Sequence, residues 1–137
     1  MVTRTQHLFE ECAENKTPVL IPALVLGETL CGTPVDEQPA LYAAILKRFM
    51  VVPYDAQATL HNARIWQEQR ELIRQLSTFE GARQAIKMDI CILSVALARD
   101  CSALYTDDER MQKIAERYIP IKTSGDLPVI FETKSFL

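Results

Sequence analysis

Three acidic side chains in this sequence stand beside apolar segments, where an unpaired charge would be costly. Glu28 lies within one apolar segment, Asp89 comes directly before a second, and Asp108 closely follows a third. A carboxylate in apolar surroundings needs a partner, and several carboxylates on one edge repel one another unless a cation neutralises them. Oxygen ligands of this kind suit Mg²⁺ or Mn²⁺, which can activate water to attack a phosphodiester. The three acids therefore predict a divalent-metal site.

Each acid taken alone also has a purely structural interpretation. Asp89 and Asp107 could be helix N-caps, whose carboxylates accept hydrogen bonds from the first turn. Glu28 could be a surface residue on the polar side of its helix. What favours the metal site is the order of Glu28, Asp89 and Thr106-Asp107-Asp108 along the chain, each beside apolar segments.

The segments around these acids follow a recurring order of helix, short apolar strand and helix. The patterns predict strands at 19–21, 50–53, 103–105 and 119–121, and helices at 6–15, 23–30, 36–49, 56–76 and 107–118. Ser77–Gly81 is expected to be a loop, and 82–88 a helical turn or loop leading to a buried helix that Asp89 opens. Strands that are apolar on both faces suit a parallel sheet between helices, with the strand C-termini at one edge. We therefore predict a three-layer α/β/α fold with a central parallel sheet.

Length and composition limit the class of protein. The chain has 137 residues, which is typical of one domain, and 48% of them are hydrophobic. A net charge of −3 argues against holding nucleic acid by overall charge. No apolar run approaches the ~18 residues of a membrane-spanning helix, and the N-terminus lacks an apolar signal core, so a cytoplasmic protein is expected. The four cysteines contain no C-x-x-C pair and are expected to be buried thiols.

Four segments together resemble the PIN domain, a nuclease family that includes the ribonuclease toxins of VapC-type toxin–antitoxin pairs. They are VLIPALVLGETL (19–30), FMVVPYD (49–55), KMDICILSVALARD (87–100) and ALYTDDERM (103–111). The resemblance implies a single PIN-like domain over residues 1–137. It also implies that Glu28, Asp89 and Asp108 hold the metal and that Thr106 supports the site by hydrogen bonding. Asp107 is either a further acidic ligand or a helix cap.

The resemblance implies a function as well. It implies a Mg²⁺- or Mn²⁺-dependent ribonuclease acting on RNA, with an antitoxin partner that inserts an arginine among the acids. A homodimer is expected, with the predicted helices 6–15 and 40–49 as candidate faces. A basic series around the long helix is either a phosphate-contacting surface or a solvated face; its members are Arg64, Arg70, Arg74, Arg83 and Lys87. Trp66 is expected to lie in the core rather than to stack on a base.

The sequence departs from the family pattern at its front. The family begins with a strand that ends in an aspartate, but Met1–Gln6 has no such strand and no aspartate precedes Asp36. The chain is therefore expected to be either a shortened version or a natural variant without that ligand. An unfilled central strand would leave backbone groups unpaired, so a partner chain or another subunit is expected to fill the gap. The alternative function is a catalytically impaired PIN-like module for binding or assembly.

Overall fold

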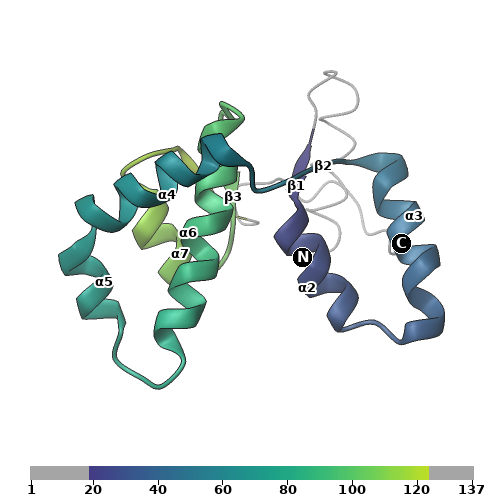
Figure 1. Ribbon diagram of the computed structural model, residues 1–137, viewed down its shortest axis with the longest axis horizontal. Coiled ribbons are helices and arrows are strands. Elements are labelled where there is room, and N and C mark those ends of the chain that lie inside the picture. Colours follow the sequence, from purple (N-terminus) through teal and green to yellow (C-terminus); the bar gives the residue numbers. More distant parts are fainter. Residues whose placement is uncertain (1–18, 124–137) are drawn as a thin grey trace. The chain divides into compact units, whose positions relative to one another are not determined.

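The computed structural model describes residues 19–123, which fall into two compact units (Figure 1). Within the described residues, unit 1 contains 19–52 and Thr123, and unit 2 contains Pro53–Lys122. The predicted helix at 6–15 and the segment before it lie outside the described residues. None of the helices within 19–123 combines the length and the apolar character needed to cross a membrane.

Unit 1 pairs two short strands in parallel. Its elements are β1 (Leu20–Pro22), α2 (Ala23–Cys31), the 3-10 turn η1 (Val35–Glu37), α3 (Gln38–Arg48) and β2 (Met50–Val52). Leu20 lies opposite Met50 in the β1–β2 ladder. Parallel neighbours require a long crossover connection, and α2 and α3 supply it. Leu26, Ile45 and Val52 are the buried apolar residues of this unit.

Unit 2 contains a second parallel ladder together with four helices. Its elements are α4 (Ala56–Glu68), α5 (Arg70–Leu76), α6 (Ala82–Ala98), β3 (Leu104–Tyr105), α7 (Glu109–Ala115) and β4 (Ile121–Lys122). Leu104 pairs with Ile121 and Tyr105 with Lys122. The predictions of parallel strands alternating with helices are thus confirmed in both units. In the described residues the strands form two separate two-stranded sheets.

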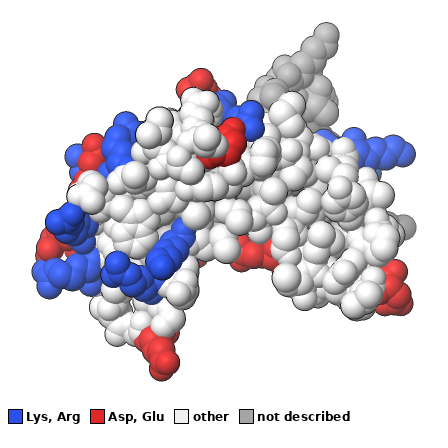
Figure 2. Space-filling model, in the orientation of Figure 1, with Lys and Arg blue, Asp and Glu red and all other residues white. Residues whose placement is uncertain are grey.

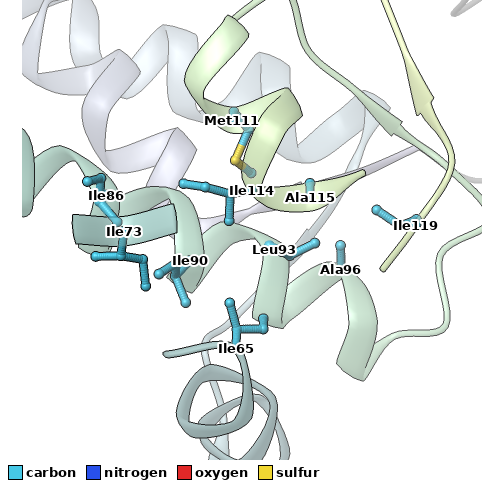
Figure 3. Packing of buried hydrophobic residues seen from close by; sticks show 10 residues of the cluster. All are labelled: Ile65, Ile73, Ile86, Ile90, Leu93, Ala96, Met111, Ile114, Ala115 and Ile119. Atoms are coloured by element: carbon cyan, nitrogen blue, oxygen red, sulfur yellow. The ribbon is translucent and has the colours of Figure 1, made fainter. Parts of the chain in front are cut away.

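The core of unit 2 is built around α6. Ile86, Ile90 and Leu93 of this helix have no exposed surface, and neither do Ile65 of α4 and Ile114 of α7. These side chains belong to one cluster, with α4 and α7 both packed against α6 (Figure 3). Trp66 is partly buried against the same cluster, as expected. The cysteines differ in their exposure to solvent: Cys91 and Cys101 are partly buried, whereas Cys31 is exposed. The prediction that the thiols are buried is therefore wrong for Cys31.

Helix α6 begins earlier than the sequence indicated. It starts at Ala82, directly after Gly81 in a left-handed conformation (φ 86°), so Asp89 lies inside the helix and does not open it. The polar residues in the first turns of α6 are typical of a loop, so the sequence did not indicate that the helix already begins there. They lie on an exposed face, as at Arg83, while Ala82 and Ile86 are buried.

The predicted helix at 56–76 is wrong as a single helix, because it breaks at Gln69 into α4 and α5. Gln69 is only 8% exposed. The residues around it are Gln, Glu and Arg, which are all good helix formers. Local helix propensity therefore gives no sign of the break at Gln69. Because Gln69 is buried, we attribute the break to tertiary packing.

Asp55 offers a test of how α4 is started. Its Oδ1 accepts a hydrogen bond from the Ala58 N–H at 3.0 Å, and its Oδ2 pairs with Arg99 Nη2 at 3.3 Å. We expect Asp55→Ala to lower the free energy of unfolding by about 0.5–2 kcal/mol through loss of the N-cap. Asp55→Asn keeps the cap and loses only an exposed ion pair, which contributes little. Chemical denaturation distinguishes the two, and an equal loss in both variants would contradict the capping role.

Candidate metal site

Asp89 is the acid that the fold of unit 2 buries. It lies in α6, among the residues that face the core, and is 8% exposed. Its Oδ2 accepts a hydrogen bond from Arg110 Nε of α7 at 2.7 Å. Burying a carboxylate without a partner is costly. The hydrogen-bonded ion pair with Arg110 therefore offsets the hydration that the Asp89 carboxylate loses on burial. The N-cap interpretation of Asp89 is wrong, since Asp89 is interior to its helix.

Asp108 is the N-cap of α7, and local hydrogen bonds fix its orientation. Its Oδ1 accepts from the backbone N–H groups of Arg110 at 2.9 Å and Met111 at 3.3 Å. Its own N–H donates to Thr106 Oγ1 at 3.2 Å. The Thr106 carbonyl in turn accepts from the Gln112 amide at 2.9 Å. The helix cap is therefore Asp108, and the interpretation of Asp107 as the cap is wrong.

Arg110 joins the two acids. Its Nε contacts Asp89, and its Nη2 lies 3.4 Å from Asp108 Oδ2. The hydrogen bond to Asp89 raises the pKa of the Arg110 guanidinium, against the opposing effect of burial, so the guanidinium stays charged. Two carboxylates from different helices thus approach one cation. Sequence reasoning did not single out Arg110, although its place in the first turn of the helix that Asp108 caps was a usable signal.

The predicted site residues fall into both units. Asp89, Thr106 and Asp108 lie in unit 2, connected by the contacts given above, and Asp107 is an exposed residue between Thr106 and Asp108. Glu28 is exposed on α2 in unit 1. The structure therefore brings two of the predicted ligands to one cation and leaves the contribution of Glu28 as a prediction.

The carboxylate oxygens of Asp89 and Asp108 suit a hard divalent cation. Asp89 and Asp108 both reach one guanidinium, so their carboxylates are within reach of a single positive charge. Among residues 19–123, no three His, Cys, Asp or Glu side chains gather closely enough to hold a metal. Mg²⁺ needs no such cage, because it commonly binds through one or two carboxylates and keeps several waters. The residues present therefore fit Mg²⁺ or Mn²⁺ held by two carboxylates.

The basic series is exposed on unit 2. Lys and Arg side chains gather where α5 and the start of α6 lie (Figure 2). Several already have partners: Arg74 pairs with Glu71, Arg83 lies 5.3 Å from the centre of the Trp66 ring, and Arg64 lies 5.6 Å from that of Tyr118. A role in contacting phosphates stays a prediction.

Comparisons with known proteins agree on the fold. The family model described as the PIN domain matches residues 3–117. The VapBC2 structure from Rickettsia felis, bound to a promoter DNA fragment, is similar with a TM-score of 0.62 and 18% identity, covering 84% of this chain and 80% of that one. The DNA-bound VapBC structure from Salmonella typhimurium has a TM-score of 0.63 and 20% identity, covering 86% and 84%. No curated protein matches. The architecture is thus a PIN-like α/β/α fold.

Proposed function

Because the chain belongs to the PIN domain family, we propose that it is a divalent-metal-dependent ribonuclease. The observation that supports this most directly is the approach of Asp89 and Asp108 to one cation, Arg110. Positive charge shared by two carboxylates favours the ionised form of both. A divalent cation at the same place would supply the Lewis acidity for phosphodiester hydrolysis.

The chain's own residues would divide the work of building the site. Asp89 and Asp108 are the proposed ligands, with Glu28 and Asp107 as further candidates. Asp89 is held by a buried helix, so its position depends on the core rather than on a loop. Thr106 acts one step away, because its hydroxyl accepts from the Asp108 N–H and thereby sets the start of α7. This arrangement orients the carboxylates before a metal or substrate arrives.

The proposal extends to partners. RNA is the proposed substrate, and the exposed basic series is the proposed surface for its phosphates. The similar structures are VapBC proteins, which supports a role as the toxin of a toxin–antitoxin pair with an antitoxin partner. A homodimer and a cytoplasmic location remain part of this proposal.

Metal removal tests the proposed activity. Purified protein is incubated with a pool of single-stranded RNA, and new RNA ends are mapped by sequencing. We expect cleavage with Mn²⁺ or Mg²⁺, loss of cleavage with a chelator, and recovery when metal is added back, because the proposed nucleophile needs a Lewis acid. Cleavage that persists in chelator, or no cleavage with either metal, would contradict the proposal.

The alternative is a PIN-like module for binding or assembly. It is favoured by one observation, that no three His, Cys, Asp or Glu side chains among residues 19–123 gather closely enough to hold a metal. Metal titration separates the two functions, since a metal that binds only the folded state raises thermal stability. An unchanged melting temperature together with retained RNA or protein binding would favour the module.

A further inference from the structure

Arg110 occupies an unusual place for a surface arginine. Its guanidinium contacts the acids of two elements, Asp89 on α6 and Asp108 at the start of α7. The Asp89 side chain is only 11% exposed, whereas that of Arg110 is 26% exposed. The carboxylate is thus the fixed partner, and the arginine is the one whose end can reach solvent.

We propose that Arg110 is an internal cation that closes the Asp89–Asp108 pair, so that a divalent metal and the guanidinium bind these acids in alternation. The proposal rests on the metal-dependent function proposed above and adds a residue that regulates access to the site. Arg110 would hold the metal-free form together, and the metal would have to displace it.

The exclusion follows from charge and distance. Arg110 Nε lies 2.7 Å from Asp89 Oδ2, an oxygen atom that Asp89 would use to bind the metal. Mg²⁺ binds carboxylate oxygens at roughly 2.0–2.1 Å, so the ion and the guanidinium would compete for the same oxygen. Like charges at such short range repel, and salt screens partly buried charges only weakly. Occupation of the pair by one cation therefore disfavours the other.

Metal affinity measured directly on the full chain tests this role. The variant Arg110→Met removes the charge and keeps much of the aliphatic stem, and Arg110→Lys keeps a charge but lacks the fork that can span two carboxylates. Arg99→Met is the matched control, because Arg99 also pairs with an aspartate of unit 2, Asp55. Free Mn²⁺ is followed by electron paramagnetic resonance, and thermal unfolding is recorded with and without the metal.

We expect Arg110→Met to bind Mn²⁺ about tenfold more tightly than the unchanged chain, since a hydrogen bond to a buried charged group no longer has to be broken. Arg99→Met should stay within about twofold, because its ion pair is more exposed. Arg110→Lys should fall between them. Without metal, Arg110→Met should melt at a lower temperature, and Mn²⁺ should raise its melting temperature more than that of the unchanged chain.

The outcomes separate this inference from the proposed function. If the unchanged chain and Arg110→Met bind Mn²⁺ equally, the gating role is overturned while metal binding stands. Weaker binding by Arg110→Met also overturns it and makes Arg110 a residue that positions the acids. If the unchanged chain, Arg110→Met and Arg110→Lys all fail to bind Mn²⁺, the proposed metal dependence fails together with the inference. Should Arg110→Met not fold, tighter binding by Arg110→Lys supports the role and equal or weaker binding overturns it.

Discussion

Asp89→Asn is expected to lower metal-dependent RNA cleavage at least about 100-fold while leaving the chain folded. Replacing a residue that merely supports a metal ligand already costs about 10–100-fold, and Asp89 is proposed as a ligand itself. Asparagine has nearly the same shape and can still accept a hydrogen bond from Arg110, so the packing of α6 is retained. The initial rate of cleavage with saturating Mn²⁺ is the measurement, with circular dichroism to verify the fold.

Asp100→Asn is the matched control for this variant. It makes the same chemical change in the same unit, at an exposed residue whose φ of 53° asparagine tolerates well. The control should keep its cleavage rate within about twofold, because surface changes away from a site have small effects. Equal rates for Asp89→Asn and the unchanged chain would remove Asp89 from the catalytic site.

Leu93→Ala is expected to lower the free energy of unfolding by about 2–5 kcal/mol, the usual cost of emptying a fully buried leucine site. Leu93 has no exposed surface and lies in α6, the helix against which both α4 and α7 pack. The loss combines the transfer of apolar atoms to water with the cavity left behind. Unfolding in urea, followed by circular dichroism, gives the value.

Leu60→Ala makes the same substitution where the side chain is 74% exposed. The expected change is within about 0.5 kcal/mol, as for other surface positions. The comparison therefore isolates burial from the change in residue type. Similar losses at Leu60 and Leu93 would show that α6 is not the core of unit 2.

The sequence predicts the ends of the short strands more accurately than the ends of the helices. β1, β2 and β3 were predicted to within a residue or so because each is a short apolar run bounded by polar residues or proline. The start of α6 was missed, since its polar first turns resemble a loop until Ile86 is seen to be buried. The break at Gln69 was missed because nothing in its local propensity disfavours a helix.

The sequence alone determined which side chains are able to do the proposed chemistry and which segments carry them. Acids beside apolar runs, and the alternation of strands with helices, depend on neighbours in the chain and can be read locally. Only the tertiary structure decided that Asp89 and Asp108 share Arg110. Asp89 and Arg110 are 21 positions apart, and their contact depends on the packing of α6 against α7, which buries apolar side chains at sites that no local pattern specifies. The same packing makes Asp89 a buried acid inside a helix rather than a cap at its start.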